Sequence, residues 1–118
     1  MLVKQDFKNY QQLLKKMEIL KKNIKVIEED IHRLEKSNKK GIKNLVILRE
    51  VYEDMYDESL KKRLAIESAI HSLEDEKYEN IMRLKYIEGK TFWQIAQIMN
   101  YDEDYIKQLH RKILKATF

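Results

Sequence analysis

The residues best suited to chemistry lie near the C-terminal end of the chain, in the run that follows Asp102. If this run is helical, Asp104, Lys107, Gln108 and Arg111 share one side of it, because side chains three and four residues apart are neighbours on a helix. These side chains donate and accept hydrogen bonds, and none is a typical nucleophile. The chemistry that they offer is recognition of a polar partner.

No other group of residues predicts catalysis or metal binding. His32, His71 and His110 are widely separated and lack the spacing of metal ligands. Cysteine is absent, which excludes disulfides and thiolate metal sites. The sequence contains no glycine-rich phosphate loop and no nucleophile constellation. We therefore expect a protein that is not an enzyme and needs no cofactor or metal, in which His110 is solvated.

Local signals predict how the chain positions the C-terminal run. Asp75 is expected to cap a helix from about Glu76 to Glu88, and Gly89 to end it. Thr91 then begins a short helix over residues 92–99. A turn over residues 100–102 follows, and Asp102 is expected to cap the last helix, from residue 103 to about residue 115.

The inner face of this C-terminal region is predicted from apolar spacing. We expect Ile106, Leu109 and Ile113 to hold the last helix to the domain, with Phe92 and Trp93 in the core. A helix-turn-helix of this kind presents one exposed helix to the major groove of DNA. Tyr105 points outward in this arrangement and is the aromatic residue best placed to reach DNA.

The N-terminal part of the chain has the spacing of a coiled coil. Residues 4–38 are expected to form one long helix whose apolar residues alternate at intervals of three and four. These are Tyr10, Leu13, Met17, Leu20, Ile24, Ile27, Ile31 and Leu34. A stripe this narrow must be buried against another helix. Both an intramolecular hairpin and a homodimer through the N-terminal helices satisfy that requirement.

The segment 42–73 is the expected partner of this helix within the chain. Asn38 and Gly41 favour the left-handed backbone that ends helices, and the apolar pattern resumes after them. Its predicted stripe is Ile42, Leu45, Leu48, Tyr52, Met55, Leu60, Leu64, Ile66, Ile70 and Leu73. Asp57 interrupts the pattern, so either one bent helix or two helices fit the segment.

Composition and charge agree with an all-α protein. The 118 residues include no proline and two glycines, and 37% are charged. Residues 4–43 hold 12 basic and 6 acidic side chains, whereas residues 44–76 hold 4 basic and 9 acidic ones. These opposite charges favour packing of the two segments as a hairpin. We predict a helical hairpin over residues 1–74 and a helix-turn-helix domain over residues 75–118.

The sequence also bears on the compartment. No apolar run approaches the roughly 20 residues that span a bilayer, and the first residues do not have the pattern of a signal peptide. We expect a soluble, cytoplasmic protein without a membrane partner.

At its C-terminal end the chain resembles region 4 of the sigma-70 family of bacterial RNA polymerase sigma factors. Three runs carry the resemblance: Leu84 to Phe92, Gln94 to Met99, and Ile106 to Leu109. It covers about residues 73–116, and the N-terminal hairpin does not resemble the rest of a sigma factor. The chain is therefore most similar to the small sigma-region-4-like regulators encoded in prophages of low-GC bacteria.

The resemblance implies a DNA-facing surface on the last helix. The matching positions are Glu103, Asp104, Lys107, Gln108 and Arg111, to which we add Tyr105 and Lys112. Gln108 can pair with an adenine edge, Lys107 or Arg111 with guanine or a phosphate, and Asp104 can accept from cytosine. The implied partners are double-stranded DNA and bacterial RNA polymerase.

Three functions are compatible with these features. The first is sequence-specific DNA binding in transcription regulation, in a phage or prophage protein. The second is DNA recognition in phage packaging, as in a small terminase subunit, where helix-turn-helix units form a ring. The third is a helical interaction module without DNA binding. A monomer or dimer favours the first function over the second.

Overall fold

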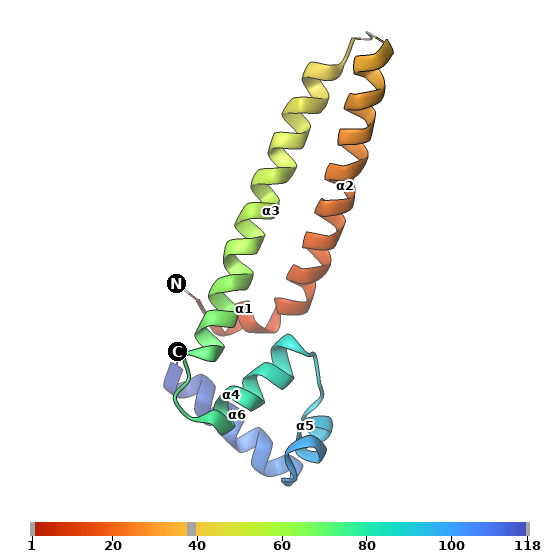
Figure 1. The fold of residues 1–118 in the computed structure, drawn as a ribbon. Coiled ribbons are helices and arrows are strands. Elements are labelled where there is room, and N and C mark those ends of the chain that lie inside the picture. Colours follow the sequence, from red (N-terminus) through yellow and green to blue (C-terminus); the bar gives the residue numbers. More distant parts are fainter. Residues whose placement is uncertain (1, 38–39, 118) are drawn as a thin grey trace. The chain divides into compact units, whose positions relative to one another are not determined.

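The computed structural model describes residues 2–37 and 40–117, and all regular structure in these residues is helical (Figure 1). The helices are α1 (Lys4–Lys8), α2 (Tyr10–Ser37), α3 (Ile42–His71), α4 (Glu76–Met82), the π-helical turn η1 (Arg83–Ile87), α5 (Phe92–Met99) and α6 (Glu103–Thr117). The all-α prediction is confirmed. None of these helices is both long and apolar enough to cross a bilayer.

The chain forms two compact units. One contains residues 1–11 and 63–118, and the other contains residues 12–62. The second unit is a helical hairpin in which α2 and α3 run antiparallel (Figure 1). Every apolar position predicted for the α2 stripe is buried or half-buried, including Met17, Leu20, Ile27 and Ile31. The interval of three and four residues therefore marks the inner side of α2 correctly.

The inner side of α3 differs from the prediction. The helix is continuous from Ile42 to His71, without a break at Asp57, but Leu48, Met55 and Leu64 are exposed. The buried and half-buried stripe runs through Ile42, Leu45, Arg49, Tyr52, Tyr56, Ser59, Arg63, Ile66 and Ile70. These positions also alternate at three and four residues, so the spacing rule holds. The stripe predicted from hydropathy was wrong because polar residues, namely Arg49, Ser59 and Arg63, occupy three of the inner positions.

The expected single helix over residues 4–38 is interrupted. Asn9 separates α1 from α2, with φ −90° and ψ 2°. Its amide still donates to the carbonyl of Gln5 at 2.9 Å, so the break is one residue wide. Asn38, expected at the other end of this helix, lies outside the described residues. Gly41 is left-handed as expected, with φ 107°.

The unit formed by residues 1–11 and 63–118 has a core built from many elements. Ile66 of α3, Ile81 of α4, Ile95 of α5 and Ile106 of α6 are all fully buried. The predicted cap of α4 is confirmed, because the Asp75 side chain accepts a hydrogen bond from the backbone amide of Lys77 at 2.8 Å. The core of this unit therefore draws one fully buried isoleucine or more from each of α3, α4, α5 and α6.

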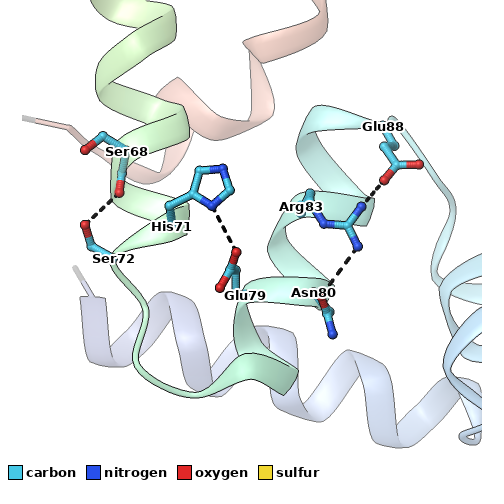
Figure 2. A network of polar contacts seen from close by, with 7 residues as sticks. All are labelled: Ser68, His71, Ser72, Glu79, Asn80, Arg83 and Glu88. Carbon is cyan, nitrogen blue, oxygen red and sulfur yellow. Dashed lines mark hydrogen bonds and ion pairs between the residues drawn. The ribbon is translucent and has the colours of Figure 1, made fainter.

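A polar network follows the path of the chain from α3 into α4 and η1 (Figure 2). His71 Nδ1 lies 3.0 Å from Glu79 Oε1, which joins the last residue of α3 to α4. Arg83 reaches both Asn80 and Glu88, bracketing the π-helical turn from either side. Of these contacts, the one between His71 and Glu79 links α3 to α4, and those of Arg83 lie within α4 and η1 and at Glu88.

The first residues of the chain are tied to the same unit. Gln11 Nε2 donates to the carbonyls of Tyr86 and Ile87 at 2.9 and 2.8 Å, and so satisfies acceptors at the end of η1. The Tyr10 hydroxyl donates to Glu67 of α3 at 2.6 Å. Gly89 follows η1 with φ 70°, as expected for a residue that ends a helix.

Candidate nucleic-acid interface

The turn between α5 and α6 has the geometry that the sequence predicts. The Thr91 side chain accepts from the amide of Gln94 at 3.1 Å, while the Gln94 side chain accepts from the amide of Thr91 at 2.9 Å. This reciprocal capping box begins α5 at Phe92. Asn100 ends the helix in the left-handed conformation, with φ 63° and ψ 45°. The chain then turns and enters α6 at Glu103.

The α6 helix has one buried side and one solvent-facing side. Ile106, Leu109 and Ile113 are buried, as predicted. Five of the predicted DNA-facing residues are exposed: Asp104, Tyr105, Gln108, Arg111 and Lys112. Glu103 and Lys107 are half-buried. The seven residues therefore lie on one helix, and five of them are freely accessible to a partner.

Charge is distributed unevenly along α6. Asp102, Glu103 and Asp104 surround its N-terminal end, where carboxylates are favoured by the helix dipole. The ammonium of Lys107 lies 3.5 Å from Glu103, so these two charges neutralise each other. Among the described residues, Arg111 and Lys112 form no ion pair. The cations available to a phosphate are thus in the second half of the helix.

Tyr105 belongs to a small surface cluster that the sequence did not predict. Its ring lies 5.1 Å from that of Tyr101, and its hydroxyl is 3.3 Å from Lys77 Nζ. The pKa of Lys77 is raised by the hydrogen bond to Tyr105 and by the nearby Tyr101. The cluster places a cation beside two aromatic rings at the start of α6.

The expectation that His110 is solvated is wrong. Only 8% of its surface is exposed, and its Nε2 lies 2.5 Å from the Tyr86 hydroxyl. Burial, followed by the positive charges of Lys85, Lys8 and Arg111, lowers the pKa of His110 to about 4. Its ring is therefore neutral at pH 7, and Nε2 can accept a hydrogen bond from the Tyr86 hydroxyl. Burial also raises the pKa of Tyr86 to about 12.

Trp93 is not a core residue. Its exposed fraction is 59%, whereas Phe92 is half-buried with its ring 5.0 Å from that of His110. The spacing of the inner residues could have revealed this. Phe92, Ile95, Ala96 and Met99 follow the i, i+3, i+4, i+7 pattern of a helix face, and Trp93 does not. Ile98, which also falls outside that pattern, has an exposed fraction of 57%.

One comparison with known proteins identifies a family. The model of the family described as "Protein of unknown function (DUF1492)" matches residues 35–116, which is more than half of the chain. The chain belongs to this family. The matched range includes α3, α4, η1 and α5, and all of α6 except Thr117. No curated protein and no solved structure matches the chain.

Proposed function

Taking the chain as a member of this family, we propose that it is a sequence-specific DNA-binding regulator of transcription. The observation that carries the proposal is the two-sided α6, held by a capped α5 and a left-handed turn, with Asp104, Gln108 and Arg111 on its solvent side. A helix held in this way can enter a major groove without unfolding. The role we propose is recognition rather than catalysis.

The outward side chains divide by what they can contact. Gln108 can form two hydrogen bonds with an adenine edge, and Arg111 can do so with guanine. Lys112, and Arg111 where it does not reach a base, can neutralise phosphates and so make binding dependent on salt. The carboxylates at the start of α6 repel phosphates. We therefore expect moderate affinity and a salt dependence set by only a few cations.

A protein partner would add to this affinity, and we propose bacterial RNA polymerase for that role. The support is the sequence resemblance to sigma-70 region 4, together with the exposed Trp93 and Ile98 on α5. Large apolar side chains at the surface are frequent at protein interfaces, and tryptophan most of all. The same resemblance supports a phage or prophage regulator.

A binding selection on randomised duplex DNA tests the proposal. We expect the wild type to enrich one short motif. Gln108→Ala should lose preference at one or two positions of that motif, at a cost of about 1–3 kcal/mol for a lost bidentate contact. Its thermal melt should match that of the wild type, because Gln108 is exposed.

Leu109→Ala is the matched control from the buried side of the same helix. It should destabilise the domain by about 2–4 kcal/mol, because it leaves a cavity under α6. Below its melting temperature it should enrich the same motif as the wild type. An unchanged motif in Gln108→Ala would reject the assignment of α6 as the reading helix. Enrichment of no motif would reject DNA recognition and favour the interaction module.

A further inference from the structure

A pocket of about 550 Å³ opens in the unit formed by residues 1–11 and 63–118. It is lined from the start of the chain, from η1 and the turn after it, from α5 and from α6. Five lining residues are cationic, namely Lys8, Lys85, Lys90, Lys107 and Arg111, and none of the described residues that line the pocket is a carboxylate. Pockets that bind small molecules in proteins have volumes of roughly 300–1,000 Å³. This pocket has the size of a ligand site and a charge of one sign.

Most of these cations have no anionic partner among the residues that the structure describes. Lys107 is paired with Glu103, but the other four form no ion pair within residues 2–37 and 40–117. Lys85 Nζ instead lies over the ring of Phe92, 4.3 Å from its centre. Like charges around one hollow repel each other, and a bound anion would relieve that repulsion.

The pKa of His110 reflects the combined effect of several of these charges. It lies in the wall of the pocket, and Lys85, Lys8 and Arg111 each lower its pKa, in addition to the larger effect of burial. The three cations come from three different segments of the chain. Because His110 is neutral and bonded to Tyr86, it contributes an aromatic surface to the pocket rather than a charge.

The other lining residues are Gln11, Gly89 and three aromatic residues. Phe7, Tyr86 and Phe92 line the pocket, with the rings of Phe7 and Tyr86 5.9 Å apart. Phe7 and Tyr86 keep only 2% and 6% of their surface exposed, so the half-buried Phe92 is the most accessible of the three rings. An accessible ring beside several cations suits a ligand with a planar ring and a strongly anionic group. A simple inorganic anion would leave the aromatic surface without a partner.

We propose that this pocket binds a nucleoside phosphate, with its phosphates against Lys8, Lys85 and Arg111 and its base against Phe92. The proposal does not depend on DNA recognition by α6. Lys107 and Arg111 also belong to the candidate DNA-facing set, so a bound nucleotide and a duplex compete for them. Where both functions are present, the nucleotide lowers the affinity for DNA.

Isothermal titration of the full chain with ATP, and separately with inorganic tripolyphosphate, tests this proposal. We expect saturable ATP binding that Lys8→Gln and Lys85→Gln each weaken about tenfold, the effect of losing one charge-assisted contact. Lys4→Gln is the matched control, because Lys4 lies on α1 with Lys8, is exposed and is outside the pocket. Phe92→Leu should weaken ATP binding and leave tripolyphosphate binding unchanged. Thermal melts verify that each variant is folded.

Several results would overturn the proposal. Absence of saturable ATP binding at millimolar concentration is one, and wild-type ATP affinity in both Lys8→Gln and Lys85→Gln is another. Equal affinities for ATP and tripolyphosphate would reject the nucleoside. If ATP fails to bind while the two lysine variants lose affinity for duplex DNA, the pocket holds a DNA backbone phosphate instead. ATP binding by a chain that does not bind DNA would support the pocket and reject the proposed function.

Discussion

The two units of this protein bury their apolar side chains to different extents. In the hairpin over residues 12–62, two helices meet along one seam, and the best-buried apolar side chains keep 4–6% of their surface exposed. In the other unit, helices converge from several directions, and Ile66, Ile81, Ile95 and Ile106 are completely covered. A pair of helices has no third neighbour to close the sides of its seam. We infer that the hairpin is the less stable unit and that the unit of residues 1–11 and 63–118 is the more stable one.

The largest test of this comparison replaces one isoleucine in each unit. Ile106→Ala should cost about 3–4 kcal/mol, because the cavity is closed on all sides and cannot collapse. Ile27→Ala removes the same atoms from the hairpin seam and should cost about 2 kcal/mol, since the flanking side chains can move in. Urea unfolding with hydrogen exchange at individual amides measures both. Equal costs would contradict the difference between the units.

The next test uses the buried imidazole of His110. Its pKa of about 4 in the folded chain lies below the ordinary value of 6.5. Folding therefore favours the neutral ring, and this stabilisation is complete above pH 6.5 and is lost as the pH falls toward 4. We expect the wild type to lose about 2 kcal/mol across this range relative to His110→Gln. An NMR titration in which His110 has a pKa near 6.5 would contradict the buried, positively surrounded site.

A comparison of the two glycines is expected to give an effect on stability of similar or smaller size. Gly41 in the hairpin has φ 107°, and a Cβ added there meets no atom within 4 Å. Gly89 after η1 has φ 70°, and a Cβ added there meets only the Gln11 side chain, at 3.5 Å. Alanine should therefore cost backbone strain alone, about 1–2 kcal/mol at each position. Asparagine tolerates the region near φ 70°, so Gly89→Asn should cost less than Gly89→Ala. Thermal melts of the four single variants, with asparagine also placed at Gly41, measure the difference.

The smallest effect tests the seam of α3. Arg49 occupies an inner position and is half-buried, whereas the neighbouring Leu48 is exposed. Arg49→Leu should be neutral or stabilise the hairpin by up to about 1 kcal/mol, because a partly desolvated charge is replaced by an apolar side chain. Leu48→Lys should change the stability by less than about 0.5 kcal/mol. Marked destabilisation by Leu48→Lys would indicate that Leu48 lies on the buried side of α3, as the hydropathy pattern predicted.

The same comparison explains which features the sequence could predict. The bounds of α5 and its turn were predictable because Gly89, Thr91 and Asn100 act through their own backbone and near neighbours. The α2 stripe was predictable because its inner positions are apolar throughout. In both regions the signal is local and does not depend on contacts between distant segments.

Other features depend on contacts that local patterns do not record. The inner side of α3 includes the polar residues Arg49, Ser59 and Arg63, so it cannot be recognised from apolar spacing. His110 packs against Tyr86 of η1 and Phe92 of α5, and the pocket cations come from four separate segments. The interruption at Asn9 has no equivalent in the apolar spacing. The DNA-facing role of α6 remains a prediction, as does the domain boundary at residue 74.

The most direct test of the central claim is an amide NMR titration of the full chain with the duplex recovered from the binding selection. The claim is that recognition belongs to the outer side of α6. We predict that the largest shifts fall at Asp104, Gln108, Arg111 and Lys112, with smaller ones at the start of α5, while amides of residues 12–62 keep their positions. Shifts concentrated in residues 12–62, with α6 unchanged at saturation, would contradict the account.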